Sequence, residues 1–206
     1  MHLHAPFSLP RRPLALALMG ALTLGLVACG GSDDAPSFKT IELNIAHIND
    51  HHSQLDAFAG TELTLDGVAT QVELGGFARQ TAIFKSLAST PNLLKLHAGD
   101  AITGSLYYTF FKGKADAQMM NSICFDAFVP GNHEFDDGDG VFQGFLDALA
   151  DPPNGGNCKT PTVSANIVTQ AGTPLAPAGA AAYLQPYTIK KIDGVDVGIV
   201  GVTIAA

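Results

Sequence analysis

Residues 41–52 read IELNIAHINDHH, a weakly alternating apolar run that ends in Asn, Asp and two His residues. The pattern returns at Leu93–Ala98, which precedes Gly99-Asp100. It returns again at Ala127–Pro130, which precedes the residues GNHE at 131–134. Ligands of open α/β sheets bind at the carboxyl ends of the strands, so three such ends predict one metal site assembled from distant parts of the chain. Carboxylate, imidazole and amide oxygen suit Zn, Mn, Fe or Co, and one Asp can bridge two ions.

Taken together, the three motifs resemble the metallophosphoesterase signature D-x-H…GD…GNH[DE]. The words at residues 48–52, 96–100 and 131–136 are closer still to the 5′-nucleotidase family of the calcineurin-like metallophosphoesterase superfamily. The similarity runs from about Ile41 to the end of the chain. It implies an α/β fold, a four-layer αββα sandwich with mixed sheets, of which this chain would supply about the first half.

The resemblance implies two divalent metal ions, such as Zn, Mn or Co, held by four side chains. It assigns Asp50 and His52 to the first ion. It assigns Asp100 to a bridge between both ions and Asn132 to the second. Because Asp50 and His52 stand two apart on an extended chain end, their side chains point the same way. Asp100 follows a glycine, which lets the backbone approach the ions closely.

The remaining histidines have other predicted roles. The resemblance makes His133 and Asp136 a catalytic pair: His133 stabilises the transition state or protonates the leaving oxygen, and Asp136 orients its imidazole. Asp136 also fits a solvated turn, because it begins an acidic run. We expect His51 to support the site or to be exposed rather than to bind metal. We expect His97 and His47 to be hydrogen-bonded core residues.

The implied reaction is the hydrolysis of nucleotide phosphate esters by metal-activated water. Other members of the fold act on cyclic nucleotides, nucleotide sugars or a sulfur-linked anion, and these substrates stay open. From a different class, a non-catalytic surface lipoprotein also stays open. The family pattern includes two later histidine motifs, whereas no histidine follows His133 before the last residue, Ala206. We therefore expect residues 41–206 to be a truncated metallophosphoesterase domain that is inactive alone.

The first 28 residues have the features of an export signal. Arg11-Arg12 form a positive region, and the apolar run Pro13–Val27 is short for a membrane span. The signal ends in LVAC, which resembles a lipobox and makes Cys29 the predicted lipidation site. Residues 29–40 then form a flexible tether. These features predict an exported protein with a lipid anchor at the periplasmic or outer-membrane surface; the alternative is an ordinary secretory signal with an incidental cysteine.

The charge of the chain argues against binding to a nucleic-acid polymer. Its 11 basic and 19 acidic residues give a net charge of −8. Removal of residues 1–28 takes away Arg11 and Arg12 and no acid, which makes the charge −10. Recognition of a phosphate backbone needs clustered Lys and Arg, and the only adjacent pair after the signal is Lys190-Lys191. The predicted partners are a phosphate-ester substrate, such as a nucleotide, and the membrane that receives the anchor.

Two cysteines remain after Cys29, and export places them in an oxidising compartment. Cys124 and Cys158 each precede a strand-like run. If those strands are parallel neighbours, both cysteines lie at the same edge of the sheet and can form a disulfide. The alternative is two buried, unpaired cysteines.

Hydrophobic periodicity and turn residues predict the remaining elements. We expect a loop-rich segment over Ser53–Leu74 and a Gly/Pro/Ala-rich surface excursion over Gln170–Ala182. Within Thr103–Ser105, capping of a following helix is favoured over a phosphate contact. A hairpin is expected around Asp193-Gly194, between strands at Tyr187–Ile192 and Val195–Val202. Helices are predicted at Phe77–Leu87, Ala115–Ile123 and Val141–Leu149, and a further strand at Thr162–Ile167.

Overall fold

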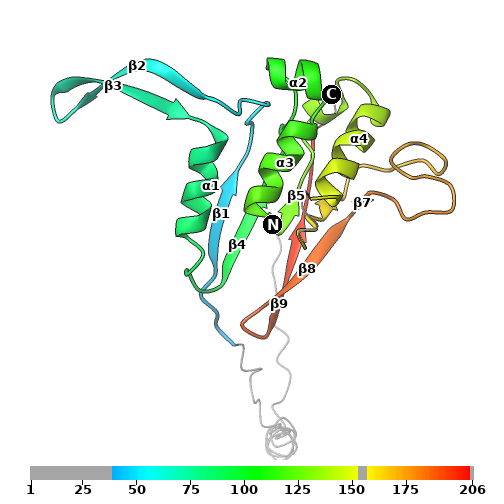
Figure 1. The fold of residues 1–206 in the computed structure, drawn as a ribbon. Coiled ribbons are helices and arrows are strands. Elements are labelled where there is room, and N and C mark those ends of the chain that lie inside the picture. The colour runs from blue at the N-terminus through cyan, green and yellow to red at the C-terminus, as the bar shows by residue number, and fades with distance from the viewer. Residues whose placement is uncertain (1–38, 153–156, 205–206) are drawn as a thin grey trace, which may run out of the picture. The chain divides into compact units, whose positions relative to one another are not determined.

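Five parallel strands form the sheet that carries the three motifs. A computed structural model describes residues 39–152 and 157–204. The sheet has the order β1-β4-β5-β6-β7, and every neighbouring pair is parallel. The carboxyl ends of β1, β4 and β5 therefore meet at one edge (Figure 1). The strands span Asn44–Ile48 (β1), Leu93–His97 (β4), Ala127–Phe128 (β5), Thr162–Val163 (β6) and Leu184–Gln185 (β7).

Helices cover one face of this sheet (Figure 1). They are α1 (Phe77–Ser86), α2 (Leu106–Phe111), α3 (Lys114–Ile123) and α4 (Asp139–Ala150). Their apolar sides join the strands in a core that includes the fully buried Phe77, Phe128 and Phe145. The short α2 is capped by Ser105, whose Oγ accepts a hydrogen bond from the N–H of Tyr107 at 3.2 Å. The predicted helices α1, α3 and α4 are confirmed, and so is the capping role within Thr103–Ser105.

The opposite face of the sheet packs against a second, two-stranded sheet. Its strands are β8 (Tyr187–Ile192) and β9 (Val195–Val200), which pair antiparallel around Asp193-Gly194 as predicted. Ile192 and Ile199 pack against residues of the first sheet such as Ala127. Since Ala127 and Phe128 are adjacent on β5, their side chains point to opposite faces. Two sheets back to back, with helices on the outer face of the first, confirm the α/β sandwich. The described residues supply three of the four predicted layers, and each sheet is wholly parallel or wholly antiparallel rather than mixed.

The segment Ser53–Leu74 contradicts the predicted loop. It forms a long hairpin of β2 (Ala57–Leu65) and β3 (Val68–Gly75), which extends from one side of the molecule in Figure 1. Asp66 and Gly67 turn the chain with φ of 51° and 81°, as a two-residue hairpin turn requires. Both faces of the hairpin are largely exposed, although its apolar residues Leu63, Leu65, Val68, Val72 and Leu74 lie on one face.

Smaller departures concern strand lengths and one histidine. The predicted strand Thr162–Ile167 shortens to β6, and β7 follows the excursion without having been predicted. His47 is exposed rather than in the core, because β1 is an edge strand and His47 points to its less covered side. Cys124 and Cys158 form the expected disulfide, with their Cα atoms 5.4 Å apart.

Other predictions concern the beginning of the chain. The signal sequence at residues 1–28, the lipidation site Cys29 and most of the tether lie outside the described residues. Within the part that the structure describes, no helix is both long and apolar enough to cross a membrane.

Candidate metal centre

Three loops at the carboxyl edge of the sheet carry the predicted site. The first loop, Asn49–Ser53, follows β1, and the second loop, Gly99–Thr103, follows β4. The third loop, Gly131–Asp136, follows β5 and contains the 3-10 turn η1 (His133–Phe135). The first two loops pair along their backbones: N–H groups of residues 50, 52 and 53 donate to carbonyls of residues 99, 100 and 101 at 2.9–3.1 Å. Parallel strand order thus brings the predicted ligands together.

Carboxylate and imidazole groups cluster where the three loops meet. His52 Nε2 lies 3.7 Å from Asp50 Oδ1 and 3.9 Å from Asp100 Oδ2. His52, Asp100 and His133 each offer one ligand atom, all within 4.8 Å of one another. Metal–ligand bonds of about 2.0–2.2 Å allow two ligand atoms of one ion to lie up to about 4.4 Å apart. The donor types and the spacing around His52 therefore fit a divalent cation.

His133 is the third member of this cluster, and a carboxylate fixes the orientation of its ring. Its Nδ1 lies 2.8 Å from Asp136 Oδ2, and its ring centroid lies 5.0 Å from that of His52. Nδ1 is the donor, because a carboxylate accepts, so Nε2 is the nitrogen left for chemistry at the cluster. The hydrogen bond to Asp136, aided by its negative charge, raises the pKa of His133. This geometry is the one expected of an imidazole oriented by a carboxylate.

The residues on either side of Asn132 lie against Asp100, a member of the cluster. Asn132 immediately precedes η1, between Gly131 and His133. The N–H of His133 donates to Asp100 Oδ1 at 3.1 Å. A Cβ on Gly131 would collide with the same carboxylate, so the motif requires glycine there. The structure thus places the third loop directly against Asp100, while the ligand roles of Asp50, His52, Asp100 and Asn132 stay predictions.

Glu134 joins the second and third loops, a role that sequence reasoning missed. Its side chain is 1% exposed, and its carboxylate accepts from four backbone N–H groups. The donors are those of Asp100, Ala101, Ile102 and Gly131, at 2.5–3.3 Å. Burial raises the pKa of Glu134 to about 7, although the hydrogen bonds oppose this shift. The acid at the end of the GNH[DE] motif was the available signal.

Comparison with known proteins agrees with this geometry. Residues 43–198 match the calcineurin-like phosphoesterases. The chain belongs to that family. It is 41% identical over 170 residues to the NAD 5′-nucleotidase of Haemophilus influenzae, which covers 82% of this chain and 26% of the relative. It is 39% identical over 169 residues to rat 5′-nucleotidase, covering 82% and 27%.

Solved structures show the same relationship. Haemophilus influenzae NAD nucleotidase matches with a TM-score of 0.69 and 40% identity over 80% of this chain. A 5′-nucleotidase precursor from Thermus thermophilus matches with a TM-score of 0.62 and 36% identity over 78%. The chain spans 30% and 28% of these two structures. Calcineurin-like phosphoesterases use divalent metals, which agrees with the donor set around His52.

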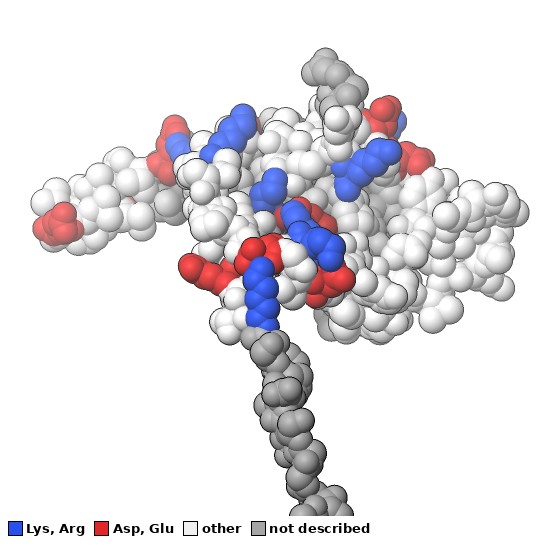
Figure 2. All heavy atoms as spheres, turned by 90° about the horizontal axis from the view of Figure 1, so that it is seen from below, with Lys and Arg blue, Asp and Glu red and all other residues white. Residues whose placement is uncertain are grey.

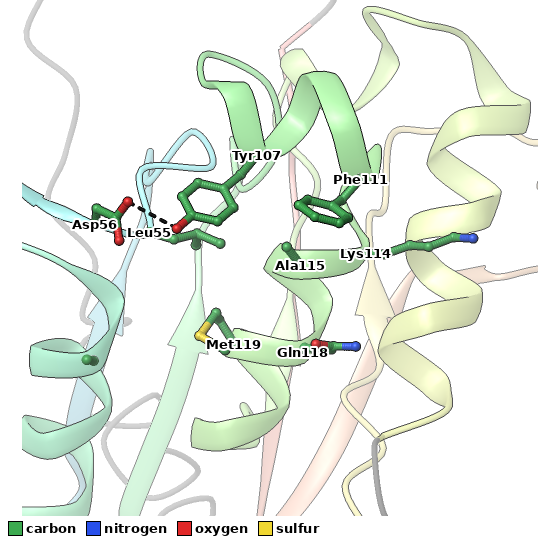
Figure 3. A pocket seen from close by; sticks show the side chains of 9 residues that line it. Leu55, Asp56, Tyr107, Phe111, Lys114, Ala115, Gln118 and Met119 are labelled. Atoms are coloured by element: carbon green, nitrogen blue, oxygen red, sulfur yellow. Dashed lines mark hydrogen bonds between the residues drawn. The ribbon is translucent and has the colours of Figure 1, made fainter.

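Two cavities lie near the first loop. One, of about 390 Å³, is lined by Asp50, His52 and the exposed Phe58 of β2, so it opens onto the metal cluster. The other, of about 580 Å³, lies between the segment after the first loop and helices α2 and α3 (Figure 3). It is mainly apolar and contains none of the predicted metal ligands; Tyr107 donates a hydrogen bond to Asp56 at its rim. The cavity at the cluster is therefore the candidate substrate site.

The two other histidines of the motifs are buried beneath the loops. His97 is fully buried, as predicted, and burial together with the neighbouring His51 lowers its pKa well below the usual range. His51 is 5% exposed, and its ring nitrogens face His97 and Asp116. His51 is thus a buried residue, which joins the first loop to β4 and α3.

Proposed function

We propose that the protein is an exported phosphoesterase of the 5′-nucleotidase type, which holds two divalent ions and hydrolyses nucleotide phosphate esters with metal-activated water. The observation that carries this proposal is the cluster of His52, Asp100 and His133, with Asp136 bonded to the back of His133. The similarity to 5′-nucleotidases of bacteria and a mammal supports the substrate class.

The side chains of the cluster divide into two roles. Asp50 and His52 would hold one ion, Asp100 would contact both, and Asn132 would contribute to the second. Divalent ions held here would supply Lewis acidity and lower the pKa of a bound water.

His133 contributes the protein's own acid–base group. Asp136 keeps Nδ1 protonated, which leaves Nε2 as the nitrogen that acts at the cluster. In its charged form, His133 can stabilise negative charge on the phosphoryl group or give its Nε2 proton to the leaving oxygen. The raised pKa of His133 favours the charged form that this role needs.

The place of action is part of the proposal. The apolar run that ends in LVAC before a polar, Gly-rich segment supports export and lipidation at Cys29. One acyl chain anchors a protein marginally, and two or more anchor it stably. Mass spectrometry of the mature protein from the membrane fraction should find a lipidated N-terminal Cys29. An unmodified N-terminus downstream of Cys29 would contradict the anchor.

The activity is tested on the protein as its gene encodes it. Purified protein, stripped of metal and supplied with Mn²⁺, Zn²⁺ or Co²⁺, is assayed for phosphate release from a nucleoside 5′-monophosphate and for cleavage of NAD. We expect metal-dependent turnover that His52→Ala abolishes and Asp139→Asn, an exposed acid of α4, leaves unchanged. Turnover confined to bis(p-nitrophenyl) phosphate would contradict the nucleotide assignment. No metal-dependent hydrolysis of any ester would overturn the proposed function.

A further inference from the structure

A continuous hydrogen-bonded chain of buried polar groups lies directly beneath the ligand loops. It runs from His97 at the end of β4 through His51 of the first loop to Asp116 of α3 and back to Ser53. All four residues are 5% exposed or less. Buried polar groups are costly unless each is satisfied, so the chain has a stringent geometry.

Only one arrangement of protons satisfies the chain. The N–H of Gly99 donates to His97 Nδ1 at 3.3 Å, so the proton of a neutral His97 is on Nε2. His97 Nε2–H then donates to His51 Nδ1 at 2.9 Å. The His51 proton is therefore on Nε2, which lies 3.2 Å from Asp116 Oδ1. The hydroxyl of Ser53 donates to the other carboxylate oxygen at 2.9 Å.

The reverse arrangement fails at both ends of the chain. A proton on His97 Nδ1 would face the N–H of Gly99, and an unprotonated His51 Nε2 would face the negative carboxylate of Asp116. The acceptor at Asp116 therefore sets the tautomers of both histidines. A carboxylate fixes the tautomer of a metal-binding histidine in the same way.

The hydrogen-bonded chain can stabilise a strained backbone, because the two loops above it adopt unfavourable conformations. Asp50, His52 and Ser53 have φ of 53°, 47° and 52°, and Asp100 has φ of 51°. Residues other than glycine avoid this left-handed region, and it persists only where surrounding contacts enforce it. His51 sits between the two predicted ligands of the first loop, and the chain ends at Gly99, next to Asp100. The chain therefore holds the backbone of both ligand loops from below.

We infer that Asp116 is a positioning residue for the metal centre, which acts through His51 and His97 on the first and second loops without touching an ion. The inference rests on the proposed function, because it presupposes that Asp50, His52 and Asp100 bind metal. It assigns a role to a buried acid of α3 that none of the three motifs contains.

Binding of Co²⁺ to the full-length protein tests this inference, with visible absorption as the readout of affinity and coordination. Asp116→Leu keeps the size of the side chain but removes the acceptor. We expect it to raise the Kd for Co²⁺ by about 10- to 100-fold and to change the absorption spectrum. Asp116→Asn should stay within about threefold of the unsubstituted protein, because its amide oxygen accepts from His51 and its NH₂ donates to Ser53.

Met120→Ala is the matched control. Met120 is also fully buried on α3, but it belongs to the apolar core. We expect this variant to lower the melting temperature while the affinity for Co²⁺ and the spectrum stay unchanged. Equal binding by Asp116→Leu and the unsubstituted protein would overturn the inference alone. Equal weakening by Met120→Ala and Asp116→Leu would do the same, and a failure of the unsubstituted protein to bind Co²⁺ would overturn the proposed function as well.

A second measurement needs no variant that could fail to fold. Imidazole ¹⁵N NMR of the unsubstituted protein should show that Nε2 carries the proton in both His51 and His97. A Nδ1–H tautomer at either residue would contradict the chain of donors and, with it, the role of Asp116.

Discussion

The carboxyl ends and the amino ends of the parallel strands, here called the carboxyl edge and the amino edge of the main sheet, are stabilised by different interactions. At the carboxyl edge, Asp50 and Asp100 lie beside His52, and left-handed backbone carries these acids. At the amino edge, a disulfide joins the segments before β5 and β6, and Asp126 pairs with Lys190 of the second sheet. Figure 2 views the molecule from the side of the amino edge and shows basic side chains interspersed with acidic ones.

This difference separates function from stability. Acidic side chains that lie close together without lysine or arginine partners repel one another and destabilise the fold. A bound metal ion would offset this repulsion. At the carboxyl edge, buried hydrogen bonds fix the loops: Asp116 bonds to His51 of the first loop, and Glu134 bonds to the backbone of the second loop. Substitutions at the carboxyl edge should therefore impair metal binding or turnover, whereas substitutions at the amino edge should lower stability and leave the chemistry intact.

The largest effect is expected at the carboxyl edge, from His133→Ala. It removes the group placed to act on the phosphate, so kcat should fall by about 10²- to 10⁴-fold. The metal content and melting temperature should be unchanged, as elemental analysis and calorimetry would show. His47→Ala, which removes an exposed histidine, is the control. Loss of metal from His133→Ala would make His133 a ligand instead.

The largest effect at the amino edge should come from the disulfide. Its cysteines are 34 residues apart, so replacing both Cys124 and Cys158 by Ser should lower the free energy of unfolding by about 3–4 kcal/mol on the loop-entropy account. Denaturant titration measures this change, and assays at a temperature where the variant stays folded should give unchanged kcat. A variant that is fully folded but inactive would contradict the separation of the two edges.

Glu134→Gln tests the brace between the second and third loops. The amide oxygen can still accept from two N–H groups, but its NH₂ would face the N–H groups of Asp100 and Gly131. We expect the affinity for Co²⁺ to fall by about 10- to 100-fold. Glu73→Gln makes the same chemical change on an exposed residue and should have no effect. Unchanged affinity in Glu134→Gln would show that the loops hold their geometry without the brace.

The smallest effect is expected from the ion pair at the amino edge. Asp126 accepts from the backbone N–H of Lys95 at 2.8 Å and pairs with Lys190. Asp126→Asn keeps the first bond and loses the ion pair, so the free energy of unfolding should fall by no more than about 1 kcal/mol. Thermal unfolding at low and high salt measures it. A larger loss, or any loss of Co²⁺ affinity, would show that this edge is coupled to the site.

Local sequence signals were sufficient where local chemistry determines the structure. The Gly-Asp and Gly-Asn-His words mark close backbone approach, and Asp193-Gly194 marks a turn, so the ligand loops and the β8–β9 hairpin could be predicted. Asp66-Gly67 carries the same turn signal, and the flanking strands place Leu63, Leu65, Val68, Val72 and Leu74 on one face. The β2–β3 hairpin was missed although this alternation was available in the sequence.

The partners of buried acids could not be predicted in this way. In the sequence, Asp116 is only a polar residue in the first turn of a predicted helix, and Glu134 is only the last residue of a motif. Their roles depend on backbone N–H groups and ring nitrogens brought from β1, β4 and β5 by the parallel strand order. Those contacts are tertiary, so only the folded chain shows which residues hold the site from behind.

The metal content of the full-length protein tests the central claim most directly. Elemental analysis should find about two divalent ions per chain, as a two-metal site requires. Asp100→Asn should lose most of this metal, because Asp100 would contact both ions, while Asp139→Asn should retain it. Absence of divalent metal from the unsubstituted protein, or full retention in Asp100→Asn, would contradict the account.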